Sequence, residues 1–136
     1  MTGFEILEHT ADVGIRAWGD SPEALFEQAA RGLADILGAW SPGDGESYDV
    51  VLESRDLEGL LVDWLNEVIY LQESRDAVLA GINVDQIQKD HLVGRVTLAR
   101  RTTVLDGTAV KAVTYHQLKA ARKDDGKWIA EVYVDV

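Results

Sequence analysis

Hydrophobic and polar residues repeat along this chain with two different periods, one typical of helices and one typical of strands. Apolar residues recur every three to four positions over 25–37 and over 57–69, which predicts two amphipathic helices. Ser21 can cap the first helix, and Gly38 is suited to end it. Asp56 can cap the second helix in the same way.

Apolar segments with a period of two fill most of the remaining chain and predict strands. These strands cover residues 4–8, 13–18, 46–53, 82–87, 92–101, 110–121 and 128–135. Helices are interleaved with the early strands, and a run of strands follows. This order predicts a single α+β domain over residues 1–136, with two amphipathic helices packed on a largely antiparallel β-sheet.

Composition supports a globular protein. The chain has 136 residues, 46% of them hydrophobic, which suffices for one domain with a real core. Cysteine is absent, which excludes disulfides and zinc sites with cysteine ligands. No apolar run is long enough to span a membrane, and the first residues lack the features of a signal peptide. We therefore expect a cytoplasmic protein with no membrane partner.

Charge is unevenly distributed. The net charge is −11, yet residues 89–127 carry nine basic and four acidic side chains, against four basic and eighteen acidic in residues 1–88. The acidic body repels polynucleotides, so no strong direct nucleic-acid binding is expected. The basic segment leaves two alternatives open: a local contact with RNA or an acidic partner, or an ordinary solvated strand face.

Hard oxygen ligands stand at two places that the predicted strands can bring together. His9 and Asp12 share the connection between the first two strands, and Asp135 ends the last strand. If the chain ends at Val136, its terminal carboxylate is a further ligand of the kind that calcium, magnesium and manganese prefer. The alternative is a hydrogen-bonded turn and a frayed terminus.

Two further polar groups are candidates for partner contact. Asp63, Asn66 and Glu67 share one face of the second predicted helix. Alternation over 110–121 places Lys111, Val113 and Tyr115 on one face of a strand and His116 on the other. A lysine beside carboxylates can bind phosphate or an acidic partner, and both groups are also compatible with plain solvated surface.

Three separated segments resemble motifs of one family, the archeases. They are residues 9–19, 60–67 and 110–116, and the final Asp135 followed by an aliphatic residue resembles a fourth motif. No phosphate-binding Gly-rich loop, serine elbow or zinc spacing competes with this interpretation. The resemblance implies an accessory protein, not an enzyme, for the GTP-dependent RNA ligase RtcB. It implies that the protein promotes ligase guanylylation and multiple turnover in tRNA splicing and RNA repair.

The resemblance also implies roles for individual residues. A divalent metal ion (calcium, manganese or magnesium) would be held by Asp12, Asp135 and the terminal carboxylate of Val136. Lys111 matches a lysine that activation needs. The other motif side chains assigned to partner activation are His9, Asp63, Glu67 and His116.

Two other functions remain open at this point. One is a general chaperone or a modulator of a tRNA-modifying enzyme. The other is a small metal-dependent hydrolase, in which His9 acts as a base beside a metal held by Asp12 and Asp135.

Overall fold

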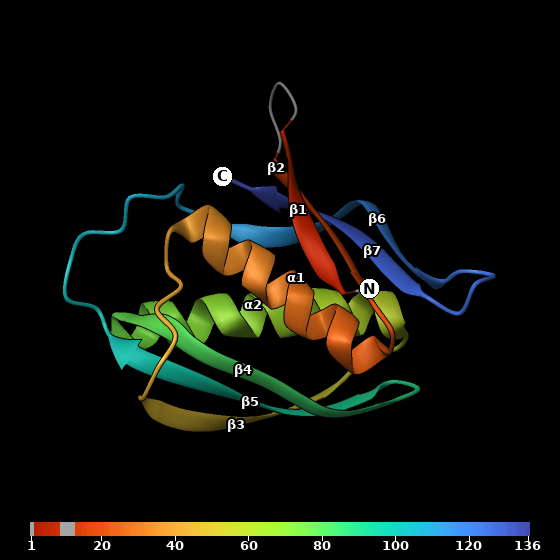
Figure 1. Cartoon of the computed structure of the whole chain (residues 1–136), viewed down its shortest axis with the longest axis horizontal. Helices are drawn as coiled ribbons and strands as arrows, with labels where there is room; N and C mark the ends of the chain where they lie inside the picture. Colours follow the sequence, from red (N-terminus) through yellow and green to blue (C-terminus); the bar gives the residue numbers. More distant parts are fainter. Residues whose placement is uncertain (1, 9–12) are drawn as a thin grey trace.

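Two antiparallel sheets enclose a layer of two helices, as Figure 1 shows. The computed structural model describes residues 2–8 and 13–136. The four-stranded sheet has the order β1 (Gly3–Glu8), β2 (Val13–Gly19), β7 (Trp128–Asp135) and β6 (Ala112–Arg122). The three-stranded sheet has the order β3 (Glu46–Glu53), β5 (His91–Arg100) and β4 (Ala77–Gln88). Helices α1 (Pro22–Leu37) and α2 (Leu57–Arg75) lie between the sheets. The predicted α+β class with antiparallel pairing is confirmed, although the strands form two sheets.

Helix α1 begins and ends where its sequence predicts. The Ser21 hydroxyl oxygen accepts a hydrogen bond from the Ala24 N–H at 3.1 Å. Gly38 adopts the left-handed conformation with φ 66°, which glycine tolerates best. A side chain at this position would also collide with the Asp106 carboxylate. The loop after β5 therefore packs against the end of α1 because residue 38 is glycine.

Helix α2 is buried over most of its circumference. Asp56 caps it, accepting a hydrogen bond from the Gly59 N–H at 2.7 Å. Its fully buried side chains are Leu60, Leu61, Trp64, Leu65 and Val68. The prediction placed the helices on one sheet, whereas α2 contacts strands of both sheets. What remains partly open is a narrow stripe of polar residues.

Helix α1 also closes one edge of the three-stranded sheet. The Glu27 carboxylate accepts a hydrogen bond from the Val84 N–H, and the Glu23 carboxylate accepts one from the Ile87 N–H, both at 2.8 Å. β4 is an edge strand, so these amide groups have no neighbouring strand on that side. The two carboxylates thereby protect an edge that could otherwise pair with another chain.

Strand β6 departs from the regular alternation expected over 110–121. Its pairing with β7 is regular through Thr114 and resumes at Lys119, with an irregularity between them. Gln117 lies in the left-handed region with φ 52°. Tyr115 was expected on the same face as Val113, and both lie toward α2: a Cβ added at Gly59 would be 3.5 Å from the Tyr115 hydroxyl. Tyr115 is nevertheless 63% exposed while Val113 is 4% exposed, because it follows the last regularly paired residue, Thr114.

Candidate functional site at one end of the four-stranded sheet

Strand pairing brings the predicted lysine and the predicted C-terminal carboxylate to the same place. Ala112 pairs with Asp135, and the Lys111 N–H donates a hydrogen bond to the Asp135 carbonyl at 2.8 Å. Both side chains are exposed, and Val136 is 41% exposed. We call this group of Lys111, Asp135 and Val136 the sheet-end site. The backbones of a lysine and an aspartate are thus adjacent at this end of the sheet.

The predictions for His9 and Asp12 lie outside the described residues. Their described neighbours, Glu8 and Val13, pair with each other, and Val13 pairs with Val134 of β7. Glu8 and Val13 therefore border the end of the sheet at which the chain's last residues lie (Figure 1). The predicted association of Asp12 with Asp135 stays a prediction.

The chemistry of the sheet-end site suits a hard cation. Over residues 2–8 and 13–136, no three His, Asp or Glu side chains gather as a metal site. The predicted metal ligands include Asp12, which lies outside these residues, so this finding does not test the predicted metal site. Asp135 is exposed and forms no ion pair with any described residue, which leaves its carboxylate available as an oxygen ligand.

Helix α2 holds the strand that carries Lys111. The Asn66 amide oxygen accepts a hydrogen bond from the Val113 N–H at 2.9 Å. Its amide nitrogen donates to the Val113 carbonyl at 3.5 Å. We call this pair of bonds the Asn66 bridge. Asn66 therefore binds the N–H and the carbonyl of Val113 as a neighbouring strand would. Val113 lies two residues after Lys111.

Asp63 and Glu67 lie on the same partly exposed stripe of α2 as Asn66. Neither side chain makes a hydrogen bond or ion pair with another described residue. Because α2 contacts β6, the fold brings this stripe to the side of the strand that follows Lys111. The predicted common face of Asp63, Asn66 and Glu67 is confirmed, whereas no sequence pattern indicated that Asn66 binds the backbone of Val113.

His116 lies further along β6, on the outer side of the four-stranded sheet. The Thr114 hydroxyl donates a hydrogen bond to the Tyr133 carbonyl at 3.3 Å, and the His116 N–H donates to the Thr114 hydroxyl at 3.3 Å. The His116 ring meets the Tyr133 ring edge-on, with centroids 6.3 Å apart. Gly14 makes room for the Tyr133 ring. His116 thus lies in the irregular part of β6, against the ring of Tyr133, which is two residues before Asp135 in β7.

Comparison with known proteins identifies the family. Residues 4–136 match the Archease protein family. The chain belongs to the archease family. Relatives named protein archease include those of Methanosarcina barkeri, 36% identical over 98% of this chain and 95% of the relative, and of Methanopyrus kandleri, 37% identical over 98% of this chain and 99% of the relative. The archease motifs therefore lie in a chain that matches its relatives over nearly the whole length.

Two solved structures share the fold of this archease-family chain. The solution structure of Methanobacterium thermoautotrophicum protein 1598 superimposes with a TM-score of 0.73 at 26% identity, covering 98% of this chain and 99% of that one. The crystal structure of a Thermotoga maritima archease, described as a possible chaperone, gives a TM-score of 0.66 at 26% identity, covering 97% and 96%. The two-sheet architecture is thus that of solved archease structures.

An ion-pair network occupies the middle of the outer sheet face in this archease-family chain. One Arg16 nitrogen lies 2.6 Å from the Glu5 carboxylate, and another lies 3.1 Å from the Glu131 carboxylate. The hydrogen bond to Glu5, then the hydrogen bond to Glu131, raises the pKa of Arg16 above its ordinary value. These carboxylates are already paired, so they do not compete with Asp135 for a cation.

None of the described helices is long and apolar enough to cross a membrane.

Proposed function

We propose that this protein is a non-catalytic accessory protein that activates the GTP-dependent RNA ligase RtcB in the cytoplasm. It promotes guanylylation of the ligase and its multiple turnover in tRNA splicing and RNA repair. Membership in the archease family supports this proposal. The observation that carries it is the backbone hydrogen bond from the Lys111 N–H to the Asp135 carbonyl, which brings the two exposed residues to the same end of the sheet.

The proposal includes a divalent metal ion, either calcium, manganese or magnesium, at the sheet-end site. Asp12, Asp135 and the terminal carboxylate of Val136, where that is the chain's last residue, would hold it. Such an ion would neutralise the negative charge of nucleotide phosphates that come close to it. The exposed Asp135 carboxylate fits this role because hard cations prefer oxygen ligands.

The other side chains have distinct tasks in the proposal. Lys111 places a fixed positive charge against a phosphate or an acidic group of the ligase. His9, Asp63, Glu67 and His116 contact the ligase around it. The Asn66 bridge keeps β6 in position, so that Lys111 stays next to Asp135.

A ligation assay with the cognate RtcB, GTP and Mn²⁺ tests the proposal. With the protein present at less than one molecule per ligase, each ligase should make many products; without it, turnover should stop early. Unchanged multiple turnover would show that the proposal is wrong. D63N/E67Q should reduce the stimulation, whereas E46Q/E53Q, which removes two exposed carboxylates from β3, should not.

A general chaperone or a modulator of a tRNA-modifying enzyme is the second candidate. The description of the Thermotoga maritima relative as a possible chaperone favours it. Suppression of aggregation of an unrelated client protein, with no stimulation of RtcB, would establish this function instead. A metal-dependent hydrolase would instead show phosphoesterase activity of the purified protein with Mn²⁺.

A further inference from the structure

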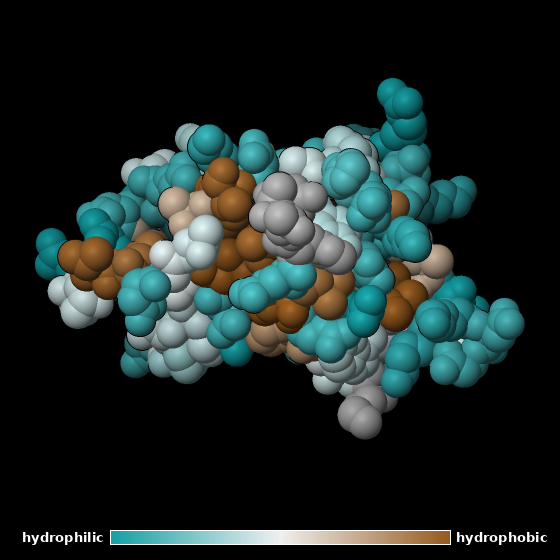
Figure 2. Space-filling model, turned by 90° about the horizontal axis from the view of Figure 1, so that it is seen from above, coloured by the Kyte–Doolittle hydropathy of each residue, from teal (hydrophilic) through white to brown (hydrophobic). Residues whose placement is uncertain are grey.

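The end of the four-stranded sheet opposite the sheet-end site is cationic. Residues 119–127, which we call the basic hairpin, carry four basic and two acidic side chains in a protein with net charge −11. The basic side chains are Lys119, Arg122, Lys123 and Lys127. None of them forms an ion pair with any residue that the structure describes. The hairpin projects from the body in Figure 1, and hydrophilic residues cover that end in Figure 2.

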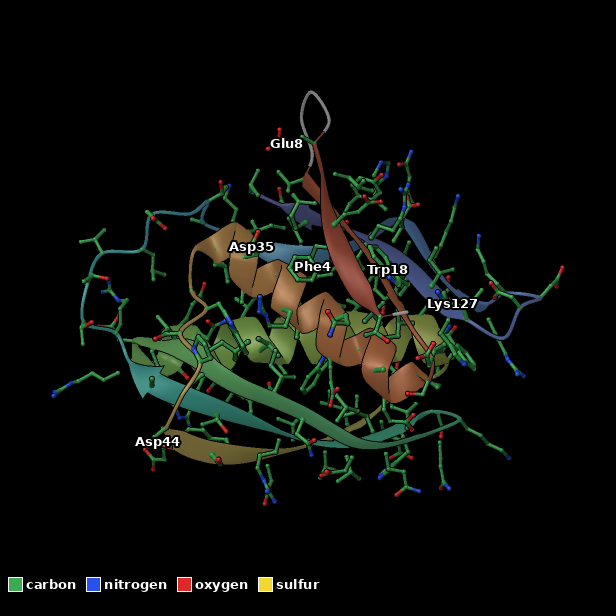
Figure 3. All side chains as sticks on the ribbon, viewed as in Figure 1. Phe4, Glu8, Trp18, Asp35, Asp44 and Lys127 are labelled. Carbon is green, nitrogen blue, oxygen red and sulfur yellow. The ribbon has the colours of Figure 1, made fainter. Side chains whose placement is uncertain are left out.

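An aromatic ring lies at the base of the basic hairpin. Trp18 pairs with Ile129, and the next residue, Gly19, pairs with Trp128. The Trp18 ring covers Gly3 on the outer face, where an added Cβ would lie 2.8 Å from its Cζ2. Figure 3 shows Trp18 and Lys127 at the same end of the sheet. The partly exposed indole therefore lies at the same end of the sheet as Lys127 and the rest of the basic hairpin.

We propose that this end of the sheet binds single-stranded RNA. Lys119, Lys123 and Lys127 contact successive phosphates, and a base stacks on Trp18. Aromatic platforms beside basic side chains are how proteins hold single strands without reading their sequence. The choice of RNA over DNA rests on the proposed function, because the ligase partner joins RNA.

The acidic remainder of the protein confines the RNA to this end and keeps its binding weak. Seven residue steps separate Trp128 from Asp135 along β7, which corresponds to about 23 Å at roughly 3.3 Å per step. One molecule can therefore present the sheet-end site to the ligase while the basic hairpin contacts the RNA being joined.

Fluorescence anisotropy of a labelled twelve-nucleotide oligouridine tests this proposal with the protein alone. No ligase or metal is present, so the outcome is independent of ligase activation. K123Q/K127Q should weaken binding on the order of tenfold near 0.1 M salt and reduce the slope of log K against log salt by about 1.4, since each phosphate contact contributes about 0.7. K89Q/R100Q removes the same charge from the β4–β5 turn and the end of β5, and should bind like the wild type.

Trp18→Leu should weaken binding about fivefold or more without changing the salt slope, because stacking releases no counterions. Trp18→Phe keeps a ring and should restore most of the affinity, which separates stacking from misfolding. If K123Q/K127Q and K89Q/R100Q weaken binding equally, the net charge of the protein alone explains the effect. That result would overturn the proposal. Equally tight binding of a polyglutamate peptide would overturn the assignment to a nucleic-acid strand, because a peptide of carboxylates offers no base to stack on Trp18.

Discussion

Replacing Asn66 by alanine tests whether α2 holds the strand that carries Lys111. Val113 is only 4% exposed, and its N–H lies 2.9 Å from the Asn66 amide oxygen. Without this acceptor, a buried amide group loses its partner, which costs about 1–3 kcal/mol. The second bond of the Asn66 bridge, at 3.5 Å, is too long to add much. We therefore expect N66A to lower the free energy of unfolding by about 1–3 kcal/mol, against roughly 5–15 kcal/mol for a typical domain.

Urea unfolding followed by circular dichroism measures this loss, with N66D as the matched control. The aspartate keeps an oxygen acceptor for the Val113 N–H, so N66D should retain most of the stability. High salt in the buffer screens its repulsion from Asp63 and Glu67. N66A should also stimulate RtcB less at temperatures where it is fully folded. An unfolding free energy of N66A within about 0.5 kcal/mol of the wild type would refute the reasoning, as would an N66D as unstable as N66A.

Three other perturbations follow from single contacts. Gly14→Ala should destabilise the fold by about 1–3 kcal/mol in urea, because the new Cβ would lie 2.8 Å from the Tyr133 ring; an unchanged midpoint would contradict this packing. Lys111→Met should keep the wild-type melting temperature yet lose ligase stimulation, since the Asp135 carbonyl binds only the backbone of residue 111. A short Gly-Ser extension after Val136 should weaken Mn²⁺ binding in calorimetry while the fold persists, and full affinity would exclude the terminal carboxylate as a ligand.

Features set by neighbouring residues were predictable from the sequence. The caps at Ser21 and Asp56 and the end of α1 at Gly38 lie where the sequence places them. The bounds of β3 and β7 also match the predicted ranges, 46–53 and 128–135. These features depend on side-chain hydrogen bonds within one turn or on strict alternation, which short stretches of sequence encode.

Features set by distant partners were not predictable in the same way. The apolar pattern of α2 does not reveal whether one sheet or two sheets cover the helix. The same leucine-rich stripe would be expected in either case. The irregularity around Gln117 in β6 arises from pairing with β7, which alternation along one strand cannot reveal. The bridge from Asn66 to Val113 joins residues 47 positions apart.

The candidate site was only partly predictable from the sequence, because part of it depends on which strands are neighbours. The backbones of Lys111 and Asp135 meet because β6 and β7 are neighbours, and no pattern of residues signals that pairing directly. The resemblance to archeases selected both residues, and the structure brings them together. The stripe of Asp63 and Glu67 followed from helical periodicity, whereas its place beside β6 required the packing of α2.

The rate of RtcB guanylylation with labelled GTP and Mn²⁺ tests the central claim most directly. Wild-type protein should accelerate formation of the ligase–guanylate adduct. Asp135→Ala should not, although its circular dichroism spectrum stays native, while Asp44→Ala, which removes an exposed loop carboxylate, should accelerate it like the wild type. If Asp135→Ala accelerates guanylylation as well as the wild type does, the sheet-end site is not the activating group.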